Sequence, residues 1–155
     1  MGIGSLARGI WAQVRGLIYL SFAKIYEEIK MVLKVEDLEI YQMAEDLSDS
    51  IWEICIRLDN FARDTVGKQI VRAADSISAN IAEGHGRYHF NDRLRFCYYA
   101  RGSLFECRSW LFKAIRRNLI KNKIEELTEI MEILPKRLNA YIASIKKVHE
   151  EDLKI

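Results

Sequence analysis

The histidines are the residues of this chain that could most readily hold a metal or move a proton. They are His85, His89 and His149, and none has a glutamate three residues before it. A di-iron centre in a helical bundle needs that Glu-x-x-His pair on two helices, so we expect no dinuclear metal site. His85 and His89 could join Glu83 around one ion, but an exposed turn is the simpler interpretation of this stretch.

Serine nucleophiles also lack the partners that catalysis needs. Ser76, Ser78 and Ser103 lie within helical patterns with no histidine at helical spacing, so no base is within reach. Such hydroxyls usually bond back to the helix backbone. The Gly-His-Gly-Arg stretch at residues 84–87 resembles a phosphate-binding turn, but a helical pattern precedes it, whereas a phosphate cradle follows a strand. We therefore expect neither an enzyme nor a cofactor.

The cysteines do not form a recognisable metal or redox motif. Cys55, Cys97 and Cys107 each lie inside an apolar-periodic run, and no Cys-x-x-Cys pair occurs. An odd number of cysteines in such positions is typical of buried, reduced thiols. We expect a cytoplasmic protein in which these thiols form no disulfide.

Charge is distributed unevenly along the chain, although the net charge is only +2. Residues 31–62 contain two basic and eight acidic side chains, whereas residues 63–121 contain twelve basic and five acidic ones. Helices of opposite charge either pair with each other, within or between protomers, or present a basic face to an anionic partner. The planar fork of arginine suits a phosphate backbone. The arginines assigned to such a nucleic-acid-binding face are Arg72, Arg87, Arg93, Arg95, Arg101, Arg108, Arg116 and Arg117.

A second set of polar and small residues is interpreted as structural. We expect Glu83 to reach Arg87 or the first turns of the next helix, and Glu106 to pair back toward Gln69 or Arg72. A network of ion pairs and caps of this kind would set the register of a helical hairpin and its subunit contacts. The residues assigned to packing and assembly are Asn80, Glu83, Gly84, Gly86, Gly102, Ser103 and Glu106.

Apolar residues recur at three- and four-residue steps over four long segments, which predicts four helices. The segments are residues 35–58, 64–83, 90–118 and 121–151. Short connections between antiparallel helices give an up-down four-helix bundle, so the expected fold class is all-α. Pro135 should kink the last helix without ending it, because the apolar pattern continues beyond it.

Small residues mark where the second and third helices should approach each other. Gly84 and Gly86 follow the expected end of the second helix, where a left-handed glycine cap is usual. Gly102 lies in the middle of the third helix and is expected to face Ala73 and Ala74 across a close crossing. The third helix carries apolar or aromatic residues on two adjoining faces, so we expect contacts on more than one side.

Residues 1–30 form an amphipathic extension ahead of a bundle domain at residues 31–155. The extension has no uninterrupted apolar run near the ~20 residues that a membrane span requires. Three interpretations stay open: a helix that docks on a protein partner, an interfacial membrane helix, or an extension upstream of a true start at Met31. Docking is favoured over membrane contact, because the polar face carries Glu27 and Glu28.

Two stretches carry a recognisable pattern: GKQIVRAADSISANIAEGHGR at residues 67–87 and RFCYYARGSLFECRSWLFKA at residues 95–114. Through them the chain from about residue 35 to residue 150 resembles a family of bacterial four-helix-bundle proteins encoded within 23S rRNA intervening sequences. The pattern departs from the family at His89 and Phe90, where a serine-led helix cap is usual, and residues 1–30 lie outside it. The positions that carry the resemblance are Gly67, Gln69, Arg72, Ala73, Ser76, Ile77, Asn80, Ile81, Ala82, Glu83, Gly84, Gly86, Arg87, Arg95, Phe96, Ala100, Arg101, Gly102, Ser103 and Glu106.

This resemblance implies a homo-oligomeric ring, usually of five protomers, and no enzymatic activity. The chain is also similar to the accessory variability determinant proteins of diversity-generating retroelements, which form basic pentamers that bind a reverse transcriptase and its RNA. The first hypothesis is therefore a non-catalytic oligomeric accessory protein whose basic surface binds RNA or DNA, together with a reverse transcriptase. The alternative is a scaffold that binds protein only, or a membrane surface, through the N-terminal helix.

Overall fold

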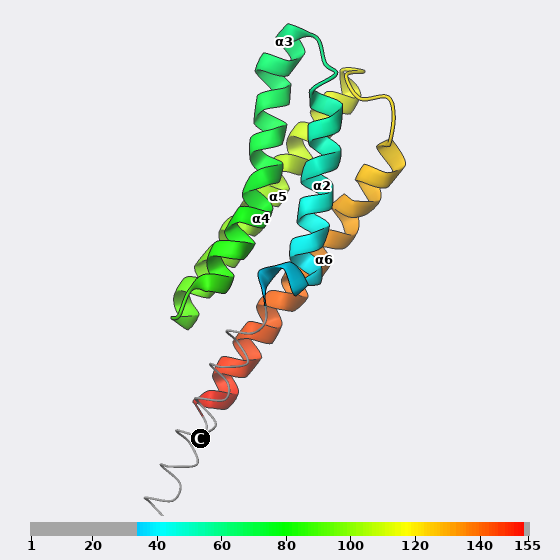
Figure 1. Cartoon of the computed structure of the whole chain (residues 1–155). Helices are drawn as coiled ribbons and strands as arrows, with labels where there is room; N and C mark the ends of the chain where they lie inside the picture. Colours follow the sequence, from blue (N-terminus) through cyan, green and yellow to red (C-terminus); the bar gives the residue numbers. More distant parts are fainter. Residues whose placement is uncertain (1–33, 154–155) are drawn as a thin grey trace, which may run out of the picture. The chain divides into compact units, whose positions relative to one another are not determined.

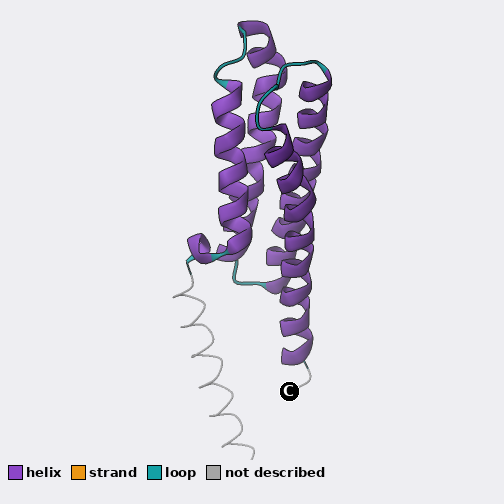
Figure 2. Ribbon diagram, turned by 90° about the vertical axis from the view of Figure 1, so that its right-hand side faces the viewer, coloured by secondary structure: helices purple, strands orange, loops and turns teal. Residues whose placement is uncertain are grey.

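The computed structural model describes residues 34–153, and the extension expected at residues 1–30 lies outside them. The chain divides into two compact units, residues 1–34 and 35–155. Over its described residues the second unit is entirely helical and contains no strand (Figure 2). The all-α prediction is thereby confirmed.

The second unit is built from four long helices with short connections. They are α2 (Glu39–Cys55), α4 (Lys68–Gly86), α5 (Phe90–Arg116) and α6 (Ile124–Asp152). Three short elements accompany them, namely the 3-10 turn η1 (Val35–Asp37), α3 (Asn60–Ala62) and the π-helical turn η2 (Arg63–Gly67). The long helices run side by side, with the α2–α3 and α5–α6 connections at one end and the α4–α5 turn at the other (Figure 1).

The apolar spacing of the sequence places one buried stripe on each long helix. On α5 the buried positions are Cys97, Ala100, Leu104, Cys107, Leu111 and Ala114, which alternate three- and four-residue steps. Large aliphatic side chains such as Leu47, Ile77 and Leu134 fill the space between the helices and are fully buried. Burying side chains of this size contributes about 1.5–3 kcal/mol each, which offsets the entropy lost by ordering the chain.

α4 and α5 approach each other closely at Gly84. A Cβ atom there would lie 3.0 Å from the Cβ of Phe96 and 3.3 Å from the carbonyl oxygen of Arg93. The expectation of left-handed glycine caps is wrong, because Gly84 and Gly86 belong to α4 and the helix ends in the extended residue Arg87. Glycine at position 84 therefore allows helix contact and does not reverse the chain.

The expectation that Gly102 faces the small residues of α4 is wrong. It is exposed, and a Cβ atom added there would meet nothing within 4 Å. The reason is geometric: Gly102 lies two residues after Ala100 and two before Leu104, both of which are buried. A step of two residues turns a helix by about 200°, which directs position 102 away from the core.

The second helix begins earlier than the apolar pattern indicates. The carboxylate of Asp59 accepts a hydrogen bond from the backbone N–H of Ala62 at 2.9 Å and caps α3. From Asn60 the chain then passes through η2 into α4 without a break. The predicted continuation of the last helix is confirmed, since α6 runs through Pro135.

One hydrogen bond links α2 to α4, and a local cap ends α5. The Ser48 hydroxyl on α2 donates a hydrogen bond to the Asp75 carboxylate on α4. At the end of α5, the N–H of Leu119 bonds the carbonyl of Ala114 at 3.0 Å, and the N–H of Asn118 bonds the carbonyl of Ile115 at 2.9 Å. With Asn118 at a φ of 54°, these two bonds form a Schellman cap, in which asparagine takes the left-handed position usually held by glycine.

Candidate nucleic-acid interface

One flank of α5 carries alternating aromatic and arginine side chains. Tyr98, Phe105 and Phe112 are spaced seven residues apart, and so are Arg101 and Arg108. Seven residues make about two helical turns, so all five lie on one side of α5, and we call them the aromatic–arginine stripe. Each follows directly after a buried position, which places the stripe at the edge of the core rather than within it.

The aromatic members of the stripe are unusually accessible for their size. Tyr98, Phe105 and Phe112 are 40%, 54% and 39% exposed. The arginine side chains lie across the aromatic faces: the Arg101 guanidinium is 5.5 Å from the ring centre of Tyr98, and that of Arg108 is 5.5 Å from the ring centre of Phe112. Cation–π contacts of this kind hold an arginine in place without neutralising its charge.

The stripe borders α6, which contributes a further cation. The Lys146 ammonium lies 5.7 Å from the ring centre of Tyr98, and the Arg101 guanidinium lies 3.5 Å from the side-chain oxygen of Asn139. Among residues 34–153, no carboxylate forms an ion pair with Arg101, Arg108 or Lys146. Together with Lys146, the stripe therefore presents three positive charges that have no ion-pair partner in the described part of the chain, beside exposed rings.

The other six arginines predicted for nucleic-acid binding do not join this surface as a group. Arg87 pairs with Glu83, as expected, and lies 4.8 Å from the ring centre of Phe96. Arg95 lies 3.8 Å from the Asp92 carboxylate in an exposed pair. The remaining four are Arg93, which is half-buried, Arg72, which is exposed on α4, and Arg116 and Arg117, which are exposed where α5 ends.

The residues predicted for assembly mostly make local contacts. The side-chain amide of Asn80 donates to the carbonyl of Ser76 at 2.6 Å, and the Ser103 hydroxyl donates to the carbonyl of Tyr99 at 3.1 Å. Both bonds stay within one helix, so they do not set the register between helices. Within the described residues Glu106 makes no ion pair, so the expected pairing toward Gln69 or Arg72 is not observed.

The outer face of α2 has the opposite character. Glu45, Asp49, Trp52 and Ile56 follow one another at steps of four, three and four residues, and all four are exposed. We call them the α2 outer face. Trp52 is 56% exposed and Ile56 is 49% exposed, which is a large apolar area for a surface helix. An acidic and apolar face on α2 thus complements, in charge and in apolar character, the basic and aromatic stripe on α5.

The buried thiols are poor nucleophiles. Burial raises the pKa of Cys55 and of Cys97 to about 11, and it raises that of Cys107 to about 12. At neutral pH these thiols are protonated, and the thiolate is the reactive form.

Over the described residues there is no group of three or more histidine, cysteine or acidic side chains that could hold a metal ion. Nor does any described helix have the length and apolarity that crossing a membrane would require.

Sequence reasoning missed the aromatic half of the stripe and the contact that Asp75 makes with Ser48. The seven-residue repeat of Tyr98, Phe105 and Phe112 is visible in the sequence, but it was interpreted only as a second contacted face. The link between Asp75 and Ser48 joins residues 27 positions apart, and no local pattern indicates it.

Comparison with known proteins agrees with this architecture. No curated protein matches the chain. A crystal structure of a protein with unknown function from the S23 ribosomal protein family of Bacteroides thetaiotaomicron has the same fold, with a TM-score of 0.59 at 22% sequence identity. That match covers 66% of this chain and 97% of the other. A family model described as 23S rRNA-intervening sequence protein matches residues 36–140, which include all but the last turns of the bundle. The chain therefore belongs to the family of 23S rRNA-intervening sequence proteins.

Proposed function

We propose that this protein is a non-catalytic accessory protein that binds single-stranded RNA through the aromatic–arginine stripe of α5. The observation that carries the proposal is the alternation of exposed rings and unpaired guanidinium groups along one helix flank. Membership of a family associated by name with 23S rRNA intervening sequences supports an RNA partner.

The chemistry of the stripe suits a single strand better than a duplex. The exposed ring of Phe105 offers a face on which an unpaired base can stack, and Arg101 and Arg108 each offer a fork of donors to a phosphate. Stacking of this kind tolerates any base, so we expect little sequence preference. Bases inside a duplex are already stacked and cannot reach Phe105 or its neighbours.

Salt dependence gives the sharpest test of the phosphate contacts. We expect the affinity for a fluorescent single-stranded RNA, measured by anisotropy, to fall steeply with salt. The double variant Arg101→Ala/Arg108→Ala removes two phosphate contacts, so the slope of log affinity against log salt should drop by about 1.4. The matched control is Lys136→Ala/Lys147→Ala, which removes two exposed cations of α6 outside the stripe. Absence of binding at low salt, or equal losses in both variants, would contradict the proposal.

We further propose that the protein assembles into a homo-oligomer of five protomers and that its protein partner is a reverse transcriptase. A ring would repeat the basic stripe around its axis and so multiply weak contacts along one RNA. A polymerase that works on that RNA is a suitable partner for such an assembly.

A scaffold that binds protein only is the second candidate, and a specific observation favours it. The seven-residue spacing of the stripe is that of a helix seam that packs against another helix. The α2 outer face of a second copy carries the complementary acidic and apolar side chains. On this hypothesis the stripe is covered in the assembly, and the Arg101→Ala/Arg108→Ala variant loses self-association instead of RNA affinity. Docking of a partner through residues 1–30 is a further form of this hypothesis.

A further inference from the structure

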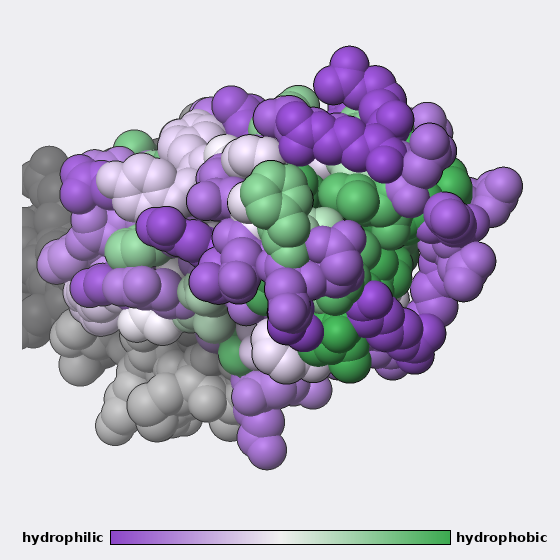
Figure 3. All heavy atoms as spheres, turned by 90° about the horizontal axis from the view of Figure 1, so that it is seen from above, coloured by the Kyte–Doolittle hydropathy of each residue, from purple (hydrophilic) through white to green (hydrophobic). Residues whose placement is uncertain are grey.

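A cluster of cations lies where α5 ends, at the end of the bundle that carries the α2–α3 and α5–α6 connections. Residues 107–124 contain six basic side chains and no acidic one. Three of the six, Arg116, Arg117 and Lys121, are exposed and make no ion pair with any residue of the described chain. We call these three residues the basic corner. Figure 3 views the molecule from this end and shows hydrophilic side chains projecting around accessible apolar ones.

The acidic side chains at this end of the bundle leave it positively charged. Residues 53–68 and 113–126 together contain eight basic and five acidic side chains. Two of the acidic ones are paired, Glu53 with Lys123 at 3.2 Å and Asp64 with Lys68 at 3.1 Å. The other three serve helix starts: they are Asp59, which caps α3, and Glu125 and Glu126, which lie in the first turn of α6. None of the five forms an ion pair with the basic corner.

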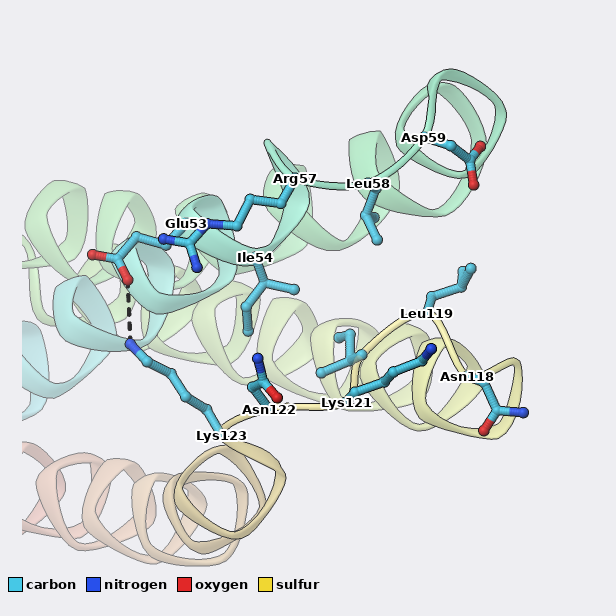
Figure 4. Close-up of a pocket in the computed structure, with 11 residues that line it drawn as sticks. Glu53, Ile54, Arg57, Leu58, Asp59, Asn118, Leu119, Lys121, Asn122 and Lys123 are labelled. Carbon is cyan, nitrogen blue, oxygen red and sulfur yellow. Dashed lines mark hydrogen bonds and ion pairs between the residues drawn. The ribbon is translucent and has the colours of Figure 1, made fainter.

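The chain at the basic corner has a defined conformation. Asn118 caps α5 with a left-handed φ of 54°, and Ile120 is buried with only 3% of its surface exposed. Residues 118–123 form one wall of a groove of about 470 Å³, and residues between 53 and 59 form the other (Figure 4). The Lys121 ammonium is directed toward Asn118 and away from Arg57 (Figure 4). Lys121 therefore extends toward the end of α5, where the two arginines of the corner directly precede Asn118.

The basic corner continues the aromatic–arginine stripe toward the end of the helix. Arg116 follows Phe112 by four residues, so it lies on the same flank of α5. Phe105, the most exposed ring of the stripe, precedes Arg116 by eleven residues, which is about 16 Å along the helix axis. At about 3.4 Å per stacked nucleotide, this distance corresponds to about five nucleotides of one strand. One RNA molecule is therefore long enough to contact both surfaces.

The two surfaces differ in the chemistry that they offer to an RNA. The stripe combines cations with the exposed ring of Phe105, which suits an unpaired base. Residues 113–123 contain five basic side chains and no aromatic one, so the basic corner can contact phosphates but offers no ring to a base. A duplex presents the phosphates of two strands and keeps its bases stacked inside, so it needs only the contacts that the corner supplies.

We propose that the RNA bound by this protein carries a junction between a single strand and a duplex, with the single strand on the stripe and the duplex phosphates against the basic corner. This inference rests on the function proposed above and names the class of RNA that the protein binds. A single strand alone leaves the corner without a partner, and a blunt duplex leaves Phe105 uncovered. Each is therefore a weaker ligand than an RNA that joins the two.

The test measures the affinity of the full chain for four fluorescent RNAs by anisotropy. They are a single strand, a blunt duplex, and the same duplex with a single-stranded overhang of either one nucleotide or about eight nucleotides, which exceeds the span from the corner to Phe105. We expect the RNA with the long overhang to bind at least tenfold more tightly than each of the other three. The reason is that the second contact becomes intramolecular once the overhang reaches from the corner to the stripe.

The double variant Arg117→Ala/Lys121→Ala removes two cations of the corner and leaves Arg116 on the flank of the stripe. It should lose most of the gain from the long overhang, while its affinity for the single strand stays that of the wild type. Lys136→Ala/Lys147→Ala removes two exposed cations of α6 and should keep the full gain. Circular dichroism checks that both variants are folded, which we expect because all four side chains are exposed.

The same titrations separate the junction from the function proposed above. If Arg101→Ala/Arg108→Ala weakens binding of the single strand but the long overhang adds no affinity, the junction is wrong and the proposed function stands. Equal affinity for the blunt duplex and the long-overhang RNA, or an equal loss of the gain in the α6 control, would also overturn the junction. If the single strand does not bind at low salt, the proposed function is wrong and the junction fails with it.

Discussion

The buried thiols of Cys55, Cys97 and Cys107 make the stability of the bundle decrease at alkaline pH. In the folded chain burial raises their pKa values to about 11, 11 and 12, above the ordinary thiol value of 9.0 that applies when the chain is unfolded. Between pH 9 and pH 11 the thiols keep their protons in the folded state and lose them in the unfolded state. Stability from this source is thus fully present below pH 9 and decreases as the pH rises toward 11, by up to ~1.4 kcal/mol per pH unit for each thiol.

A Cys107→Ala variant isolates this contribution. We expect its free energy of unfolding, measured in urea from pH 8 to pH 11, to fall less steeply with pH than that of the wild type. Titration of lysines affects both proteins alike and cancels in the comparison. Parallel pH profiles would show that the Cys107 thiolate is not penalised by burial. The smaller side chain lowers stability at every pH, but that offset does not change the slope.

At the scale of the helices, Gly84 in α4 is needed for a close contact, whereas Gly102 in α5 is exposed. At Gly84 an added methyl group would press on the Cβ of Phe96 and the carbonyl of Arg93, neither of which can move without shifting α5. Gly84→Ala should therefore reduce the free energy of unfolding by about 1–3 kcal/mol. Gly102→Ala should raise it by ~1 kcal/mol, because position 102 is open and alanine favours the helix.

Urea unfolding of the two variants beside the wild type checks both signs. Each variant is the control for the other, since both are glycine-to-alanine changes inside a long helix. If the free energy of unfolding changed in the same direction in both variants, the assignment of Gly84 to the helix contact and of Gly102 to the exposed side of α5 would be wrong. The sequence showed that both glycines lie in or near helices, but whether each faces a neighbour depends on the crossing of α4 and α5, which no local pattern specifies.

At the scale of the whole molecule, the α2 outer face and the aromatic–arginine stripe are two complementary surfaces on one protomer. Such surfaces join copies head to tail and can close into a ring. On the scaffold hypothesis, in which these surfaces pack together, the mass of the wild type in sedimentation rises with concentration. Phe105→Glu should shift the protein to the monomer with unchanged helicity, because Phe105 is 54% exposed and does not support the core.

Val148→Glu is the matched control, since it places the same charge on an exposed apolar site of α6, where Val148 is 37% exposed. It should assemble as the wild type does. A wild type that stays monomeric at all concentrations, or a control that dissociates equally, would contradict assembly through the stripe. RNA affinity measured on the same variants then distinguishes a surface that binds RNA from one that binds a second copy.

The sequence by itself determined the helical class, the four long helices and their buried stripes, because each follows from a local 3.6-residue period that places Leu47 or Leu134 inward wherever the helix lies. It also indicated the pairing of Glu83 with Arg87, which are four residues apart on one helix. Tertiary structure alone decided which arginines remain unpaired, that Gly84 meets Phe96 of α5, and that Arg57 and Lys121 line one groove. These depend on how whole helices are rotated and offset against each other, and that arrangement is set by many contacts between residues far apart in the chain.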